Sequence, residues 1–138
     1  MRKLIGRTIS AAVVAILLLD ASINLFAPHL LQNEMNAVQF PAELAPVLAM
    51  IMVICAVLHA LPRTSFVGAI LITGFFGGAI CIHLRAGELL SPAQLISFAL
   101  GAAAWGGLCL RDQRLQELVL CRALPGGAAL EKIDRSIL

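Results

Sequence analysis

The sequence predicts an all-α membrane protein, in which four transmembrane helices form an antiparallel bundle with both termini in the cytoplasm. Three observations predict this fold: four long apolar runs, a composition poor in charge, and Lys and Arg residues gathered on one side of the runs. Hydrophobic residues make up 60% of the 138 residues and charged ones 13%, whereas a soluble domain carries about 25% charged residues. Lipid is therefore the expected solvent for most of the chain.

The four apolar runs have the length of membrane spans. They cover about residues 9–26, 44–61, 66–84 and 92–110, close to the ~20 residues that a helix needs to cross ~30 Å of hydrocarbon. Only helices and closed barrels satisfy their backbone hydrogen bonds in lipid, and continuously apolar runs indicate helices. Each run is therefore predicted to be one transmembrane helix.

The positive charges predict how the chain is threaded. If the spans alternate in direction, Arg85 alone falls on one side, and the other Lys and Arg residues share the opposite side. The crowded side holds Arg2, Lys3, Arg7, Arg63, Arg111, Arg114, Arg122, Lys132 and Arg135. The positive-inside rule places that side in the cytoplasm. A cleaved signal peptide is the alternative, but the triplets at Asp20–Ser22 and Leu25–Ala27 fit a cleavage site poorly.

The connections predict the remaining organisation. Residues 28–40 carry apolar residues at roughly helical spacing, which predicts a short helix on the outer surface. The connection at residues 62–65 is very short, so the second and third spans must be antiparallel neighbours. Residues 111–124 suggest an interfacial helix that Pro125-Gly126-Gly127 breaks. We therefore expect one membrane domain over residues 1–124 and a cytoplasmic tail over residues 125–138.

Four polar residues form the candidate polar site: Asp20, Asn24, His83 and Arg85. Asp20 lies about six residues, or ~9 Å, inside the outer end of the first span, and Asn24 lies one turn further out on the same face. One interpretation is a polar site open to the outer side, with Asp20 as a proton acceptor or cation ligand. The other is an ion pair from Asp20 to His83 or Arg85 that fixes how the first and third spans pack. His59, near the inner end of the second span, is interpreted as an interfacial residue.

Small residues predict close helix packing. Gly74, Gly77 and Gly78 in the third span, and Gly106 and Gly107 beside Trp105 in the fourth, form smooth faces that let helices approach. We expect these faces to pack against each other or against a second copy of the protein, and a narrow substrate path beside them is the alternative. The four cysteines, Cys55, Cys81, Cys109 and Cys121, are interpreted as small apolar residues.

The sequence carries no catalytic motif. It contains no phosphate-binding loop, metalloprotease helix, serine-hydrolase elbow or Rossmann glycine pattern. Its Cys and His spacing predicts no metal site, and the net charge of +2 with no basic patch among aromatics predicts no nucleic-acid partner. An enzyme is therefore the less favoured class, and no cofactor is identified.

The third and fourth spans resemble those of the DoxX-like membrane proteins of bacteria. The residues that carry the resemblance fall within residues 61–115; they are Leu61–Ser65, Gly68–Leu71, Thr73-Gly74, Gly77–Ala79, His83–Arg85, Trp105–Leu108 and Leu110–Asp112. The resemblance implies a four-helix bundle in the bacterial inner membrane. Some members resemble the small membrane subunit of a thiosulfate:quinone oxidoreductase, and others are linked to redox or detoxification complexes. The first span of the family often carries Asp and, four residues later, Lys; here these are Asp20 and Asn24.

Two functional hypotheses follow. The first is a non-catalytic membrane subunit or scaffold of a redox or stress-response assembly, with quinone as a candidate ligand and a redox subunit or a second copy as partner. The second is a small transporter or ligand-binding protein with its site at Asp20, Asn24, His83 and Arg85. A direct contact from Asp20 to His83 or Arg85 in a closed bundle would favour the scaffold. A cavity that reaches Asp20 would favour the ligand site.

Overall fold

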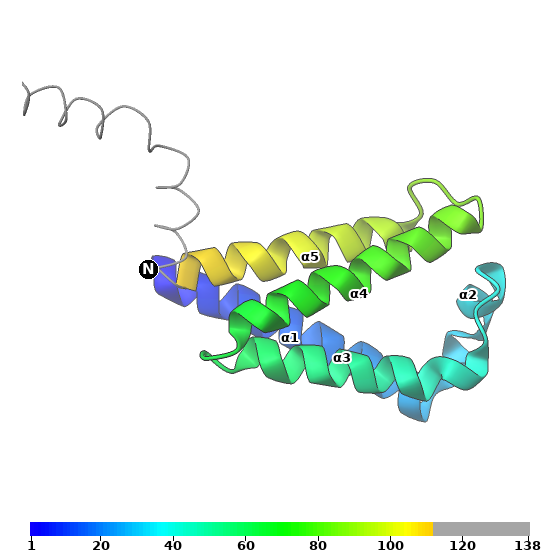
Figure 1. The fold of residues 1–138 in the computed structure, drawn as a ribbon, viewed down its shortest axis with the longest axis horizontal. Coiled ribbons are helices and arrows are strands. Elements are labelled where there is room, and N and C mark those ends of the chain that lie inside the picture. The colour runs from blue at the N-terminus through cyan, green and yellow to red at the C-terminus, as the bar shows by residue number, and fades with distance from the viewer. Residues whose placement is uncertain (112–138) are drawn as a thin grey trace, which may run out of the picture.

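A computed structural model describes residues 1–111 of the chain. Its elements, in order, are α1 (Arg2–Phe26), η1 (Pro28–Leu30), α2 (Gln32–Ala37), η2 (Ala42–Leu44), α3 (Ala45–Ala60), α4 (Ser65–Arg85) and α5 (Pro92–Arg111) (Figure 1). Within residues 1–111, four helical segments are long and apolar enough to cross a membrane. They are α1, the segment Ala42–Ala60 (which contains α3), α4, and α5. The protein is thus an all-α, multi-pass membrane protein.

The observed helices agree closely with the predicted spans except at the start of α1. α3, α4 and α5 begin and end within about one residue of the predicted limits. α1 begins at Arg2 instead of Ile9, because hydropathy marks the part of a helix in hydrocarbon, whereas its backbone hydrogen bonds continue beyond it. A short helix is present within residues 28–40 as α2, and its place at the outer membrane surface stays a prediction. The predicted interfacial helix, the domain limit at residue 124 and the tail lie outside the described residues.

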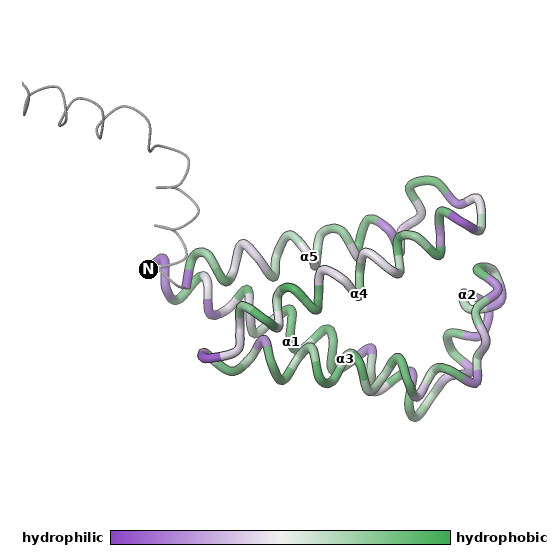
Figure 2. Tube along the Cα trace, viewed as in Figure 1, coloured by the Kyte–Doolittle hydropathy of each residue, from purple (hydrophilic) through white to green (hydrophobic). Residues whose placement is uncertain are grey.

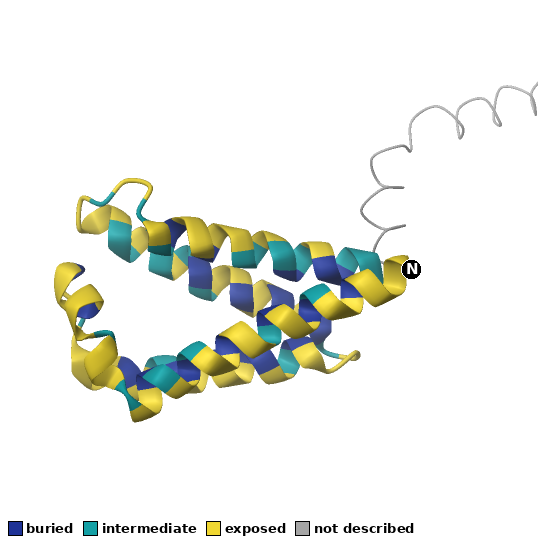
Figure 3. Cartoon of the chain, turned by 180° about the vertical axis from the view of Figure 1, so that it is seen from behind, coloured by how far each residue is buried: buried dark blue, intermediate teal, exposed yellow. Residues whose placement is uncertain are grey.

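The four long helices form a ring. α1 packs against α3 and α5, and α4 packs against the same two helices, so that α1 and α4 occupy diagonal positions. The three-residue connection at residues 62–64 makes α3 and α4 neighbours, as the sequence predicts. The buried residues of the four helices lie on the faces turned toward one another (Figure 3), and their apolar side chains form one cluster. They include Val13, Leu17, Met52, Ala56, Ile72 and Ala104.

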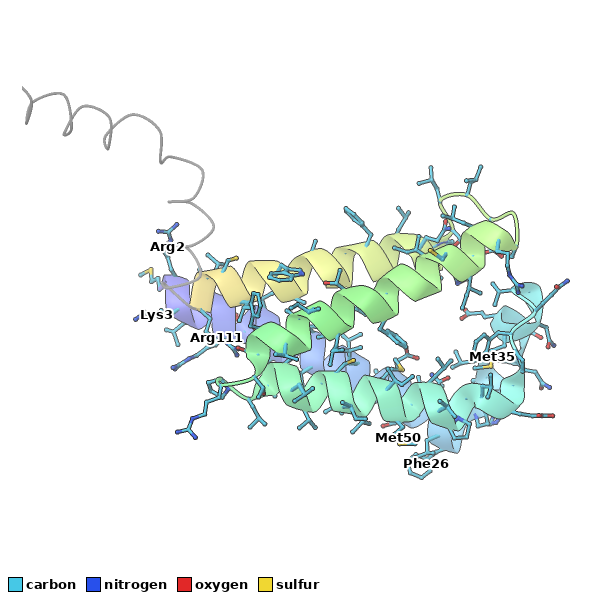
Figure 4. All side chains as sticks on the ribbon, in the orientation of Figure 1. Arg2, Lys3, Phe26, Met35, Met50 and Arg111 are labelled. Carbon is cyan, nitrogen blue, oxygen red and sulfur yellow. The ribbon has the colours of Figure 1, made fainter. Side chains whose placement is uncertain are left out.

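The two ends of the bundle differ in charge. Figure 4 shows Arg2, Lys3 and Arg111 together where α1 begins, and Met35 of α2 at the opposite end. We call the first the basic end and the second, which carries Glu34, Glu43 and Glu88, the acidic end. In Figure 2 the hydrophilic stretches gather at these two ends, with the apolar spans between them.

The helices are closest at the basic end. A Cβ on Gly68 of α4 would lie 2.6 Å from the His59 Cα of α3, and a Cβ on Gly6 of α1 would lie 2.8 Å from the Gly107 carbonyl oxygen of α5. No side chain fits in either place, so glycine permits both approaches. From their connection, α3 and α4 diverge toward the acidic end, where α2 lies near the wider opening (Figure 1).

Candidate functional site

A cavity of about 710 Å³ occupies the acidic half of the bundle, where α3 and α4 diverge. Its walls come from α1, the α2 region, α3 and α4. Most of the lining is apolar, including Leu48, Met52, Ile70, Leu71, Phe75 and Ile82. Cavities of about 300–1,000 Å³ with apolar walls and a few polar groups are typical of small-molecule sites. The cavity therefore has the size and character of a ligand site.

The cavity is open at the side of the bundle. Ile51 of α3, and Ile70 and Leu71 of α4, line it while remaining 41%, 48% and 41% exposed. These residues lie on the spanning segments, where the surroundings of an exposed apolar side chain are lipid. With these helices in a membrane, the opening between α3 and α4 would face its hydrocarbon, and a molecule dissolved in the bilayer could reach the cavity from there.

Gly74 and Gly78 give the cavity room on the α4 side. Both line it, and a Cβ at either position would meet no atom within 4 Å. The same holds for Gly77 and Gly106, so these four glycines are not pressed against a neighbouring helix of this chain, unlike Gly107, which contacts Ile9 and Ser10 of α1. Within the single chain, the expected close approach through Gly74, Gly77, Gly78 and Gly106 is a wrong prediction. Packing against a second copy stays a prediction.

Asp20 and Asn24 of α1 form the polar wall of the cavity. They lie four residues apart on one helix face, and the Asn24 Nδ2 donates hydrogen bonds to the Asp20 carbonyl oxygen at 2.9 Å and to Asp20 Oδ1 at 3.2 Å. Asn24 is only 5% exposed. Because both Asp20 atoms are acceptors, the amide must present its NH₂ group to them. Its Oδ1 is left without a hydrogen-bond donor among the described residues.

His83 lies at the acidic end of α4 and is held by the turn that follows. The backbone N–H of Glu88 donates to the His83 carbonyl at 3.1 Å, and that of Gly87 donates to the Leu84 carbonyl at 3.0 Å. This pair of bonds is a Schellman motif, with Gly87 at the required positive φ of 83°. The motif brings Glu88 Oε2 to 2.7 Å from His83 Nδ1. Because a carboxylate only accepts, Nδ1 carries the proton.

The structure brings three of the four predicted polar residues together. Asp20, Asn24 and His83 line the cavity described above. Arg85 is exposed and lines neither that cavity nor a second, smaller one of about 310 Å³ between α2 and the connection from α4 to α5. The predicted ion pair from Asp20 to His83 or Arg85 is wrong: among residues 1–111 the one contact at ion-pair distance joins His83 Nδ1 and Glu88 Oε2, 2.7 Å apart. The reason is that α1 and α4 lie diagonally in the ring. Asp20 and His83 each have a nearer partner on their own segment, Asn24 and Glu88 respectively.

The model of the DoxX-like family matches residues 8–107. The chain belongs to the DoxX-like family. Comparison with curated proteins and with solved structures gave no match. The whole lining of the cavity, from Asp20 to His83, falls within the matched residues.

In this DoxX-like protein Asn24 is the local hydrogen-bonding partner of Asp20. The resembling family often has Lys at this position, and its replacement by Asn favoured an ion pair from Asp20 to His83 or Arg85 across the bundle. The structure instead gives Asp20 an amide hydrogen bond from Asn24. An amide supplies a donor without a positive charge, so the Asp20 carboxyl group has a neutral partner, and not a cation, one turn away on α1.

Two residues of interest escaped the sequence reasoning. Glu34 of α2 lines the cavity beside Met35, which is 7% exposed; the buried Met35 and Val38 orient this short helix, but the spacing alone does not say which helices it covers. His59 is fully buried and so is not an interfacial residue as interpreted. Neither of its ring nitrogens has a partner among the described residues, and its carbonyl oxygen accepts from Arg111 Nη2 at 3.5 Å.

Proposed function

We propose that this DoxX-like protein binds a small amphipathic molecule in the cavity between α3 and α4, as a ligand-binding or transport protein of the membrane. One observation carries the proposal. Asp20, Asn24 and His83 line an open cavity of about 710 Å³, and Asp20 is not engaged in a closed ion pair among residues 1–111. A carboxyl group that only fixes helix packing has no need of a cavity beside it.

The lining has an apolar part and a polar part, which supports a ligand with an apolar body and a polar end. The apolar body would lie against Ile51, Ile70 and Leu71, where burial of apolar surface contributes about 25 cal/mol per Å². The polar end would lie at Asp20 and Asn24, which need hydrogen-bonding partners inside the membrane. With the basic end in the cytoplasm, as the charge distribution predicts, the cavity belongs to the outer half of the membrane of a bacterial cell, and the ligand would be exchanged there.

Filling the cavity from a glycine tests the proposal. In Gly78→Leu the new side chain projects into the cavity without meeting another atom of the chain within 4 Å of its Cβ. We expect this variant to remain folded and to lose saturable binding of a neutral probe, dodecanol, measured by titration calorimetry in nanodiscs against protein-free nanodiscs. Gly106→Leu is the matched control, because Gly106 is equally open but lines neither cavity. Equal binding by both variants would overturn the proposal.

A membrane subunit of a redox or stress-response assembly is the second candidate. Its support is membership of the family together with the lateral opening, since quinones reside in the hydrocarbon that this opening faces. In this reading the cavity holds a quinone and a partner subunit carries out the chemistry. Copurification in a mild detergent tests the partner, and a protein that is isolated alone under every growth condition would count against this candidate.

A further inference from the structure

We infer that the ligand of this cavity is an amphipathic organic ammonium ion, whose N–H groups bind Asp20 and Asn24 and whose apolar body lies between α3 and α4. The inference rests on the proposed function and names the chemical class of its ligand. It is drawn from three features of the polar wall: an unsatisfied acceptor, an excess of acceptors over donors, and an excess of negative charge.

The first feature is the buried Oδ1 of Asn24. Asn24 lines the cavity and is 5% exposed. Its Nδ2 donates hydrogen bonds to the Asp20 carbonyl oxygen and to Asp20 Oδ1. The Oδ1 atom has no donor among the described residues. A buried acceptor without a partner costs about 1–3 kcal/mol. Because Oδ1 is closed off from the cavity surface, a ligand donor reaches it only when the Asn24 amide turns toward the cavity, and a donor that meets it there gains that energy.

The second feature is that the neighbouring groups are acceptors as well. The Asp20 carboxylate accepts one bond, from Asn24, and retains further lone pairs. Glu34 of α2 adds a second carboxylate to the lining. A carbonyl or carboxylate ligand would place another acceptor against these oxygens. An alkylammonium group offers three N–H donors and no acceptor, which matches a wall of acceptors.

The third feature is the charge of the wall. Asp20 and Glu34 both line the cavity, and His83 is the only basic residue among the lining residues. His83 is hydrogen-bonded to a third carboxylate, Glu88, at 2.7 Å, so a charge on its ring would be offset there. Arg85 lines neither cavity. A carboxylate in a spanning helix is costly without a counter-charge, and a bound cation supplies one.

The same residues do not favour a metal cation. In residues 1–111, no group of three His, Cys, Asp or Glu side chains is placed to hold a metal ion. Apart from His83, the lining that α3 and α4 contribute is apolar, which suits a hydrocarbon body and not the hydration shell of an inorganic ion. The lateral opening also selects molecules that dissolve in the bilayer. An ammonium ion on an apolar body satisfies both the polar wall and the opening.

Three probes with the same C12 chain and different head groups separate the contribution of the head group to binding from that of the apolar chain. Dodecylamine, dodecanol and dodecanoate are titrated into the full chain in phosphatidylcholine nanodiscs, with binding measured by calorimetry. We expect dodecylammonium to bind about tenfold or more tightly than dodecanol, as expected for hydrogen bonds to charged groups, and dodecanoate to bind weakest. Tightest binding by dodecanol or dodecanoate would overturn the ammonium assignment while leaving the proposed ligand site in place. Absence of saturable binding by all three would overturn both.

Substitutions at Asp20 and Glu34 test whether the polar wall of the cavity causes the preference for the ammonium head group. Asp20→Asn keeps an acceptor for the Asn24 amide and removes the charge. Glu34→Gln removes the second negative charge of the wall, on α2. We expect each to weaken dodecylammonium binding, Asp20→Asn by about tenfold or more, with dodecanol binding unchanged within about twofold. Glu43→Gln removes an equal charge from a residue that lines neither cavity and should leave both affinities unchanged. Equal losses for ammonium and alcohol, or for all three variants, would contradict the assignment.

The ammonium group can belong to a free amine or to a lipid. The titration is therefore repeated in nanodiscs that contain phosphatidylethanolamine, whose head group carries a primary ammonium. Unchanged dodecylammonium affinity would identify a free amphipathic amine as the ligand type. Competition by the lipid that disappears in Asp20→Asn would identify the lipid head group as the source, and would support the same chemistry at Asp20.

Discussion

The close contact between α3 and α4 at the basic end can be tested at one atom. In Gly68→Ala the new Cβ would lie 2.6 Å from the His59 Cα and 2.7 Å from the Leu58 carbonyl carbon. Both are backbone atoms, so the two helices must move apart. Overpacking of this kind costs about 1–3 kcal/mol, while exchange of Gly for Ala inside a helix returns at most about 1 kcal/mol. We expect a net destabilisation of about 1–2 kcal/mol.

Thermal unfolding in a mild detergent measures this loss. Trp105 is the only tryptophan of the chain, and it packs edge-on against Phe66 of α4 with ring centroids 5.7 Å apart, so its fluorescence reports on the bundle. We expect the Tm of Gly68→Ala to fall by several degrees. Gly106→Ala is the control, because its Cβ meets no atom within 4 Å and its Tm should be unchanged or higher. If the two variants have equal Tm values, α3 and α4 do not approach through Gly68, and the account of the diverging helices fails.

Two further predictions concern the packing that shapes the bundle. Leu17→Ala removes a side chain that is 1% exposed and should destabilise the protein by about 2–5 kcal/mol. Leu19→Ala is the control, because Leu19 is 64% exposed, and it should leave the Tm nearly unchanged. Equal losses of stability in the two variants would contradict the assignment of the buried face of α1. Thr73→Val removes the acceptor of the Trp105 indole N–H, whose nitrogen lies 2.8 Å from the Thr73 hydroxyl oxygen. We expect the free energy of unfolding to fall by about 0.5–1.5 kcal/mol and the Trp105 fluorescence emission to shift. An unchanged emission spectrum would show that this hydrogen bond is not formed.

Much of the fold could be predicted from the sequence because lipid imposes strict rules. Apolar runs of this length have to be helices, and the short connection at residues 62–64 has to make α3 and α4 neighbours. The start of α1 was missed, because Arg2, Lys3 and Arg7 end the apolar run without ending the helix. Hydropathy locates the hydrocarbon, and only capping residues or proline locate the end of a helix.

The candidate site was predicted in part. Asp20, Asn24 and His83 were singled out as polar residues in apolar segments, and all three line the cavity. The predicted pairing failed because residue spacing fixes the face of each helix but not the order of helices around the ring. Because α1 and α4 lie diagonally, each side chain binds a residue of its own segment. Asp20 accepts a hydrogen bond from Asn24 one turn away, and His83 binds Glu88, which follows the turn at Gly87.

The glycines illustrate the same limit. Gly68 and Gly74 look alike in the sequence, yet Gly68 contacts the α3 backbone and Gly74 lines open space. The difference arises from the angle between α3 and α4, which brings them together near their connection and apart toward the acidic end (Figure 1). No local pattern encodes that angle, so the cavity itself could not be predicted.

The most direct test of the central claim follows the Asn24 side-chain amide by nuclear magnetic resonance in nanodiscs during a titration with dodecylamine. The account predicts saturable shifts of the Asn24 NH₂ signal and of the Gly74 and Gly78 amides, which line the cavity, and unchanged amides at Gly101 and Gly106, which do not. Saturable shifts that spare Asn24, or that are equally large at Gly106, would contradict the claim that the acidic half of the bundle holds a ligand site with Asp20 and Asn24 as its polar wall.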